Sequence, residues 1–224
     1  MNVLIVGSGK LASELLNELQ LDAALDVVAW RDRSPSSTRS IVVHAGSGRE
    51  LQEVIAFCRQ TNSVLIELAT GSVLEILAPT FPVILCPNTN LLMLKFMSML
   101  SSSGHLFNEY DIHITESHHA GKTSTPGTAV AIAQSLGQAA EHIVSIRDPD
   151  EQSATLHIPK EHLARHAFHR ISIEDAVCRI SMETRVYGTS PYAPGVSRIV
   201  DATYARTLDN RIYAINEFIE NGWV

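Results

Sequence analysis

The chain has 224 residues, of which 45% are hydrophobic and 18% charged, a composition typical of a folded protein with one large domain or two small ones. The formal net charge of -7 and the lack of a Lys/Arg-rich run argue against nucleic acid as the main partner. Every apolar run ends well before the ~20 residues that a membrane span needs, so no membrane contact is expected.

The three cysteines, Cys58, Cys86 and Cys178, are far apart in the sequence and odd in number. They have neither the pattern of a disulfide framework nor the spacing of a zinc site. This usage fits a reducing cytoplasm, and it predicts no metal centre.

The amino-terminal segment has the pattern of a strand, a glycine turn and a helix. Residues 2–6 form a continuous apolar run, which predicts a strand buried on both faces of a parallel sheet rather than a signal peptide. Leucines at helical spacing follow the turn, and in this context the G-x-G-x-x-A spacing predicts a dinucleotide site. The residues predicted to contact the cofactor here are Gly7, Ser8, Gly9, Lys10, Leu11 and Ala12.

A second strand is predicted at residues 26–30, and charged residues follow it. Asp32 lies where an acidic residue accepts hydrogen bonds from the adenosine ribose. Arg33 beside it is suited to a 2′-phosphate. These two cofactor contacts leave both NADH and NADPH open, and an exposed ion pair in a loop is the alternative interpretation.

Strands and helices continue to alternate up to residue 90. Strands are predicted at 40–43, 63–67 and 82–86, a helix at 50–61 and a short helix at 73–77, which together favour an α/β fold with a Rossmann-like doubly wound parallel sheet. Ligands of such sheets bind beyond the carboxyl ends of the strands. This rule places His44 in the crevice, and it adds the cofactor contacts Leu68, Ala69, Thr70, Pro87 and Asn88.

The pattern changes after a Leu/Met-rich helix predicted at 91–100. Strands are predicted at 110–115, 154–158, 167–173 and 176–184 without a helix between each pair. This predicts a central α+β domain with a mixed or antiparallel sheet, one face of which is suited to a second subunit. A helix at 196–207 and a last element at 212–220 are predicted to return to the first domain, and residues 34–37 and 187–195 are predicted loops.

Reactive side chains are concentrated in residues 116–129. This stretch follows the strand-like run at 110–115 and precedes an apolar helical run at 129–136, so it is predicted to be a loop. Its imidazole and ammonium groups are suited to proton transfer to a small acidic substrate, or to charge stabilisation on it. These groups belong to His118, His119 and Lys122.

The helix after this loop is predicted to begin at Gly127-Thr128, where free N–H groups would form an anion site. His118 and His119 are adjacent and would point to opposite sides of an extended chain, which is unfavourable for joint metal binding. A polar surface loop whose histidines cap neighbouring groups is the alternative.

With these residues the chain resembles the 4-hydroxy-tetrahydrodipicolinate reductase family, formerly called dihydrodipicolinate reductase, of bacterial lysine and diaminopimelate synthesis. The family signature is close to E-x-H-H-x-x-K-x-D-x-P-S-G-T-A. The residues that match it are Glu116, His118, His119, Lys122, Pro126, Gly127, Thr128 and Ala129. Weaker similarities in family order are the glycine turn, Asp32-Arg33, Ala69-Thr70-Gly71, Asn88 and residues 192–196.

The resemblance implies a nucleotide-binding domain formed by residues 1–90 and 197–224, and a substrate-binding and tetramerisation domain formed by residues 91–196. It implies hydride transfer from NADH or NADPH to a cyclic dicarboxylate in a homotetramer. His118 would be the catalytic histidine and Lys122 the proton donor. The substrate carboxylate would be held by His119, Gly127 and Thr128.

The chain departs from the family pattern at several positions. Ser124 replaces the family Asp, the Ser before Gly127 is missing, and the first turn is one residue shorter than usual. The Gly-Thr-Thr-Gly run expected near the nicotinamide is replaced by Leu68-Ala69-Thr70-Gly71. These departures leave two alternatives: another Rossmann oxidoreductase acting on a small amino or dicarboxylic acid, and a nucleotide-binding homologue without turnover.

Overall fold

The computed structural model describes residues 1–34, 38–187 and 192–224, and the predicted loops at 34–37 and 187–195 fall partly outside them. The chain divides into two compact units, one formed by Met1–Leu94 with Ser190–Val224 and the other by Lys95–Thr189. The boundary predicted at 196–197 falls inside helix α6 (Ala193–Tyr204), whereas the structure assigns this helix to the first unit. No helix in the described part of the chain is both long and apolar enough to cross a membrane.

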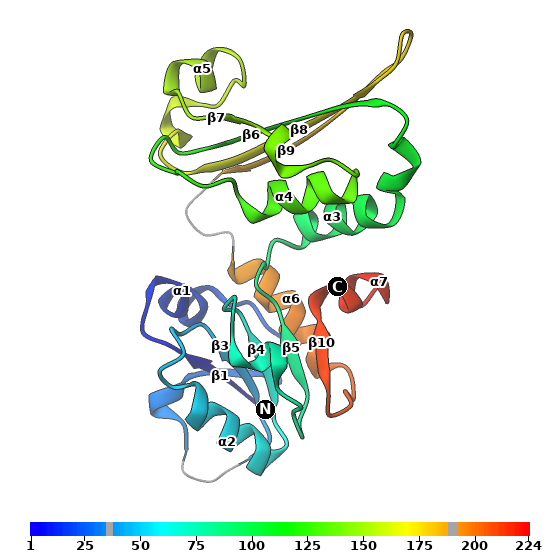
Figure 1. Cartoon of the computed structure of the whole chain (residues 1–224). Coiled ribbons are helices and arrows are strands. Elements are labelled where there is room, and N and C mark those ends of the chain that lie inside the picture. Colours follow the sequence, from blue (N-terminus) through cyan, green and yellow to red (C-terminus); the bar gives the residue numbers. More distant parts are fainter. Residues whose placement is uncertain (35–37, 188–191) are drawn as a thin grey trace. The chain divides into compact units, whose positions relative to one another are not determined.

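The first unit contains a six-stranded sheet whose paired strands are all parallel (Figure 1). The order β10-β5-β4-β3-β1-β2 places β1 and β3 side by side at the point where the strand order reverses. The strands are β1 (Asn2–Val6), β2 (Asp26–Ala29), β3 (Ile41–His44), β4 (Val64–Glu67), β5 (Val83–Leu85) and β10 (Ile212–Ala214). The predicted doubly wound sheet is confirmed.

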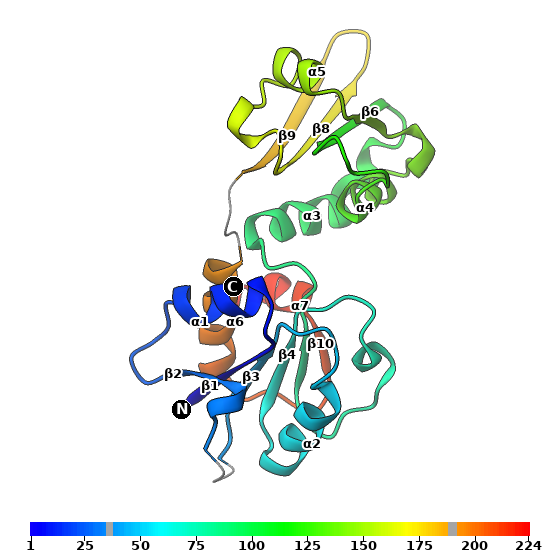
Figure 2. The same cartoon turned by 90° about the vertical axis from the view of Figure 1, so that its left-hand side faces the viewer.

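Alternating side chains of the buried strands supply two cores, one on each face of this sheet. Val3 and Ile5 pack in a cluster with residues of α1 (Lys10–Glu18) and α6, and Leu4 and Val6 pack in a cluster with residues of α2 (Leu51–Thr61). Figure 2 shows α1 and α6 on one side of the sheet and α2 on the other. A strand that is apolar at every position therefore has a covered surface on both sides, as parallel sheets require.

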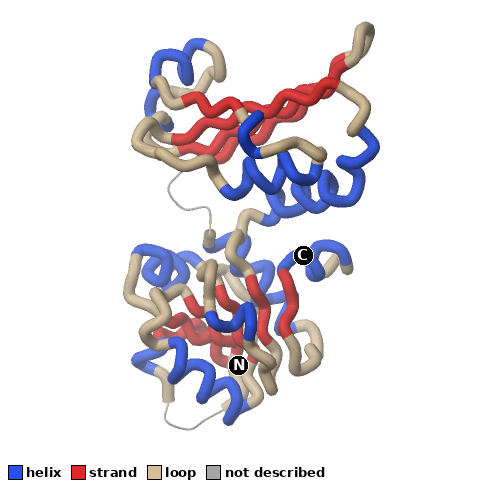
Figure 3. The backbone as a smooth tube through the Cα atoms, viewed as in Figure 1, coloured by secondary structure: helices blue, strands red, loops and turns tan. Residues whose placement is uncertain are grey.

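The second unit contains a four-stranded mixed sheet of order β7-β6-β8-β9 (Figure 3). Strand β6 pairs in parallel with β7 and antiparallel with β8, and β8 and β9 form an antiparallel hairpin. The strands are β6 (Asp111–His118), β7 (Val144–Ile146), β8 (His166–Glu174) and β9 (Arg179–Tyr187). Residues of α3 (Leu91–Ser103) and α4 (Gly127–Ser135) pack against one face in an apolar cluster that includes Leu100 and Ile132. The predicted mixed sheet is confirmed.

Several local predictions were wrong. Residues 154–158 are not a strand, because α5 (Pro149–Ala154) precedes a loop there; the Asp148 carboxylate accepts from the Asp150 and Glu151 N–H groups and so starts this helix. Strand β7 was not predicted. Strand β6 continues to His118, so the first residues of the stretch at 116–129 belong to the sheet and not to a loop. The predicted last element is two elements, β10 and α7 (Ile215–Glu220).

The buried Gly195 makes a close backbone approach within the first unit, which yields a testable prediction. A Cβ atom on this residue of α6 would lie 1.8 Å from the carbonyl oxygen of Thr89. We expect Gly195→Ala to lower the free energy of unfolding by about 3 kcal/mol or more, because backbone rather than a flexible side chain must move. Denaturant unfolding measures this, with the exposed Arg198→Ala of the same helix as the control. A Gly195 variant as stable as the Arg198 variant would contradict the close approach.

Candidate functional site

The glycine turn of the first unit has the geometry of an anion site. Gly7 has a φ of +129°, and a Cβ on it would lie 2.9 Å from the Ala45 carbonyl oxygen. Apart from its chain neighbours, no described residue has an atom within 4 Å of the place where a Cβ on Gly9 would be, so a ligand has room to reach the backbone there. Helix α1 begins at Lys10 without a side-chain cap. Its first-turn amides therefore suit a phosphate group, and this arrangement fits the pyrophosphate of a dinucleotide.

The two charged residues after β2 are in different environments. Asp32 ends a short 3-10 helix (Trp30–Asp32), and its side chain is 64% exposed. The Arg33 guanidinium lies over the Trp30 ring, 3.7 Å from the ring centroid, and pairs with Glu53. Asp32 forms an exposed ion pair with Arg31 (Nε to Oδ2, 3.6 Å) and stays accessible to a ribose, whereas Arg33 has both an aromatic and an anionic partner.

The remaining predicted cofactor residues follow β4 and β5, at the same carboxyl edge as the glycine turn. The Leu68 N–H donates to the His44 carbonyl (3.1 Å), and the Ala69 N–H donates to Glu67 Oε1 (2.9 Å). Thr70 and Pro87 are exposed, and Asn88 Oδ1 accepts from the Asn90 N–H (2.9 Å). The parallel sheet therefore aligns these loops along one edge.

Glu116 is the centre of the candidate site in the second unit. Its side chain has no exposed surface, and it accepts hydrogen bonds from the Ser145 hydroxyl, the Arg147 guanidinium and His118. Burial alone would raise the pKa of this carboxyl, but these bonds lower it to about 2. Glu116 is therefore a carboxylate at any working pH.

This carboxylate sets the orientation of His118. The distance from His118 Nδ1 to Glu116 Oε2 is 2.8 Å, and the His118 carbonyl accepts from the Gln152 amide (2.8 Å). Because a carboxylate only accepts, Nδ1 carries the hydrogen, and Nε2 is the nitrogen left to exchange a proton with a substrate. The His118 side chain is 16% exposed, so a small molecule can reach it.

Arg147 also connects Lys122 to this carboxylate. Arg147 Nε donates to the Lys122 carbonyl (3.0 Å), while its Nη1 donates to Glu116 Oε2 (3.1 Å). The Lys122 N–H donates to the His119 carbonyl (3.0 Å), which closes a turn. Within the described residues the Lys122 ammonium makes no ion pair. The structure thus connects the ring of His118 directly, and the backbone of Lys122 through Arg147, to the buried Glu116 carboxylate.

The other predicted substrate ligands are more peripheral. His119 is exposed, and its ring lies against Gly121, where a Cβ would be 3.4 Å from Nδ1. Helix α4 begins at Gly127 after Pro126 without a side-chain cap from the described residues, and apart from neighbouring backbone none of those residues comes within 4 Å of a Cβ on Gly127. The amides of Gly127 and Thr128 are therefore open to an anion, as at the start of α1.

His169 is a buried member of this cluster that was not predicted from the sequence. It is paired with Glu116 across β6 and β8, its ring centroid lies 5.8 Å from that of His118, and its Nδ1 lies 2.9 Å from the Thr184 hydroxyl. Burial and the neighbouring His118 lower its pKa to about 4, so it stays neutral. Its Nε2 has no hydrogen-bond partner among the described residues.

A signal for His169 was present in the sequence. In the predicted strand at 167–173, His169 lies two and four positions before Ile171 and Ile173. It therefore shares their face of the strand, which is the buried one. Arg147 and Ser145 had a weaker signal, since β7 has only three residues. Gln152 and its contact with His118 lie on α5, which was not predicted as a helix, so no pattern could place them.

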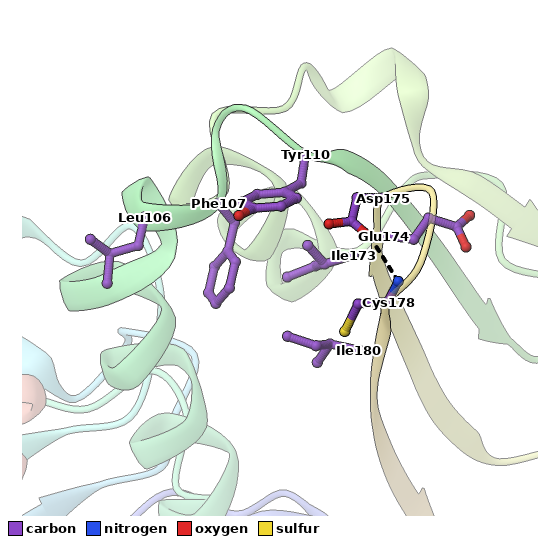
Figure 4. A pocket seen from close by; sticks show the side chains of 8 residues that line it. All are labelled: Leu106, Phe107, Tyr110, Ile173, Glu174, Asp175, Cys178 and Ile180. Atoms are coloured by element: carbon purple, nitrogen blue, oxygen red, sulfur yellow. Dashed lines mark hydrogen bonds between the residues drawn. The ribbon is translucent and has the colours of Figure 1, made fainter.

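A separate cavity of about 290 Å³ opens at the other end of the second unit (Figure 4). The dashed line in that view marks the hydrogen bond from the Cys178 N–H to Asp175 Oδ1 (2.7 Å). The lining residues are Leu106, Phe107, Tyr110, Ile173, Glu174, Asp175, Cys178 and Ile180. This set contains none of the predicted site residues, so the cavity is distinct from the His118 cluster.

The fold and these two clusters define a class: two-domain proteins that join a Rossmann-like nucleotide domain to an α+β domain with polar site residues. The model of the family described as "Dihydrodipicolinate reductase, C-terminus" matches residues 91–219. Since this is more than half of the chain, the protein belongs to the dihydrodipicolinate reductase family.

Relatives with assigned names agree with this membership. The probable 4-hydroxy-tetrahydrodipicolinate reductase 2, chloroplastic, of Oryza sativa subsp. japonica is 32% identical over 126 residues, which cover 52% of this chain and 39% of the rice protein. The chloroplastic 4-hydroxy-tetrahydrodipicolinate reductase 1 of Arabidopsis thaliana is 33% identical over 129 residues, which cover 52% of this chain and 36% of that protein. The matched segments therefore span less than half of either relative.

A solved structure has a similar fold over nearly the whole chain. Dipicolinate-bound dihydrodipicolinate reductase from Paenisporosarcina sp. TG-14 superposes with a TM-score of 0.68 and 17% identity, covering 96% of this chain and 98% of that one. The likeness shows that both units, and not only the part matched by the family model, have the architecture of this family.

The buried His169 leads to a prediction about pH. Its pKa falls from 6.5 in the unfolded chain to about 4 in the fold, so the unfolded chain binds a proton that the folded protein does not. The resulting stability is complete above pH 6.5 and is lost as the pH falls toward 4. In His169→Asn this loss should shrink by on the order of 3 kcal/mol.

Denaturant unfolding at a series of pH values measures the effect. The exposed His142→Asn is the matched control and should follow the wild-type curve. An equally steep loss of stability between pH 6.5 and 4 in His169→Asn and the wild type would contradict a neutral buried His169.

Proposed function

We propose that this protein catalyses the NADH- or NADPH-dependent reduction of 4-hydroxy-tetrahydrodipicolinate to tetrahydrodipicolinate in lysine and diaminopimelate biosynthesis. The family match covers the whole stretch at 116–129, and the relatives named above carry this activity in their names. The observation that supports the proposal best is the fixed His118, whose Nδ1 is held by a buried carboxylate while the ammonium of nearby Lys122 makes no ion pair within the described residues.

The proposed reaction replaces a hydroxyl group by hydrogen, so it consumes a hydride and a proton and releases water. The reduced nicotinamide supplies the hydride when it is bound. Lys122 is proposed to donate the proton, and His118 to exchange a proton at Nε2 and stabilise charge on the substrate. The open amides of Gly127 and Thr128, with His119, would bind a carboxylate group of the substrate.

The two units have separate roles in this proposal. The first unit binds the nucleotide through the Gly7–Ala12 turn, Asp32 and the loops after β4 and β5, while the second unit binds the dicarboxylate. The strand β9 is an edge of its sheet and exposes Ile180, which supports assembly into a homotetramer through this unit. The three cysteines are unpaired, which supports a reducing cytoplasm.

Lys122→Ala tests the assigned chemistry. The assay couples the protein to the synthase that makes its substrate and follows the oxidation of NADH or NADPH. Loss of the proton donor should lower kcat by about 100-fold or more. The affinities of the variant for the nucleotide and for dipicolinate, each measured by calorimetry, show whether the nucleotide site and the substrate site are intact.

The exposed Lys95→Ala in the same unit is the control and should keep the wild-type rate. A Lys122→Ala variant as fast as the wild type would contradict the role of Lys122. A wild-type protein that binds nucleotide without turnover in the coupled assay would contradict the proposed function.

The charges after β2 predict the preferred cofactor. Arg33 is already held by Glu53 and Trp30, and the exposed Asp32 carboxylate would repel a 2′-phosphate, so NADH should bind about tenfold more tightly than NADPH. Asp32→Ala should reduce this preference by weakening NADH binding, whereas Asp26→Ala, at the exposed start of β2, should not. Tighter binding of NADPH by the wild type would refute the assignment.

A further inference from the structure

A buried histidine and a buried glutamate pair at the carboxyl edge of the first sheet. His44 is the last residue of β3 and Glu67 the last of β4, and the two are in register. His44 Nδ1 lies 2.8 Å from Glu67 Oε1, and the two side chains are 1% and 0% exposed. Both residues belong to strands that end where ligands of doubly wound sheets bind.

Glu67 holds the loop after β4 in place. Oε1 also accepts from the Ala69 N–H (2.9 Å), and Oε2 accepts from the Ser72 hydroxyl (3.1 Å). Since both oxygens accept hydrogen bonds, the side chain acts as a carboxylate and His44 donates from Nδ1. The loop that contains the predicted cofactor contacts Leu68 to Thr70 is thus tied to His44 through one carboxylate.

The other side of the His44 ring faces the segment after β3, which in turn lies against the loop after β1. A Cβ on Gly46 would lie 3.0 Å from His44 Nε2, so this nitrogen faces the segment after β3. That segment lies against the glycine turn, because a Cβ on Gly7 would lie 2.9 Å from the Ala45 carbonyl oxygen and 3.2 Å from Gly46 Cα. The segment after β3 thus lies between the His44 ring and the loop after β1, while the loop after β4 is bound to His44 through Glu67.

His44 Nε2 has no hydrogen-bond partner in the described part of the chain. Buried polar atoms normally have a hydrogen-bond partner, so this unpaired nitrogen calls for an explanation beyond the bond from Nδ1 to Glu67. The position is also special, since β1 and β3 flank the point where the strand order reverses. These observations together indicate a role in the ligand site rather than in the core.

We infer that the His44–Glu67 pair is a positioning device that holds the three loops around the nicotinamide nucleotide and thereby sets its affinity. The inference rests on the proposed function, because it assumes that this edge binds the nucleotide. His44 itself acts through the loops and does not touch the reacting atoms. Loss of the pair should therefore raise the Kd and KM for the nucleotide and leave kcat at saturation nearly unchanged.

Two substitutions of His44 separate the effect of its hydrogen bond to Glu67 from the effect of filling the space of its side chain. The Asn amide can replace Nδ1 as a donor to Glu67, whereas Leu cannot. We expect His44→Leu to weaken NADH binding about tenfold, and His44→Asn to stay within about threefold of the wild type. NADH titration monitored by calorimetry gives the Kd, and the coupled assay gives KM and kcat. If His44→Leu does not fold, Ser72→Ala removes another tie of the same carboxylate and should weaken binding about threefold.

Ser63→Ala is the control, because it removes a buried hydroxyl at the opposite edge of the same sheet, where Ser63 accepts from the Ser40 N–H. It should bind NADH as the wild type does. Unchanged affinity in His44→Leu, or in Ser72→Ala where that variant replaces it, overturns the inference, as does an Asn variant as weak as Leu. A wild-type protein that binds neither NADH nor NADPH overturns the proposed cofactor as well, so the two failures are distinguishable.

Discussion

Glu116 has no exposed side-chain surface and remains ionised, because Arg147, Ser145 and His118 all donate to it. Removing a carboxylate from water costs several kcal/mol, which is offset only when its oxygen atoms have good hydrogen-bond donors. The same bonds have a second effect. They fix which nitrogen of His118 carries hydrogen, and through Arg147 they hold the turn that presents Lys122. The stability of the second unit and the chemistry proposed for it thus depend on one buried carboxylate.

The first unit uses a related device without an arginine. Glu67 is as buried as Glu116, but its described partners are an imidazole, a backbone amide and a hydroxyl. In each unit a carboxylate on a strand near its carboxyl end orients a histidine and a loop. The two histidines differ in accessibility, since the side chain of His118 is 16% exposed whereas that of His44 is 1% exposed. Of these two histidines, only His118 is accessible enough for the proton exchange proposed above.

Much of the fold could be predicted, because strands buried on both faces are continuous apolar runs and helices have a different period. The run at 2–6 and the alternation at 110–115 each placed a strand. Short elements were not predicted. The three residues of β7 are too few to show a hydrophobic periodicity, and the start of α5 depends on a single capping residue, Asp148. The end of β6 was also missed, because Glu116 looks like a loop residue until its partner Arg147 is known.

Only part of the candidate site could be predicted, because a sequence pattern groups residues that are close together in the chain. His118, Lys122 and the start of α4 are close in sequence, so one motif contains them. Arg147, Gln152 and His169 come from distant segments, and no local pattern encodes that β6 pairs with both β7 and β8. Long-range pairing of strands, rather than residue type, decides which polar groups surround Glu116.

The tautomer of His118 at neutral pH tests the central claim most directly. Long-range 1H–15N NMR of the histidine-labelled protein distinguishes the two ring nitrogens, and His118→Gln assigns the signal. A carboxylate at Glu116 predicts that His118 Nδ1 carries a hydrogen both when the ring is neutral and when it is protonated. A neutral ring with hydrogen on Nε2 alone would contradict the account, because Glu116 would then not orient the imidazole.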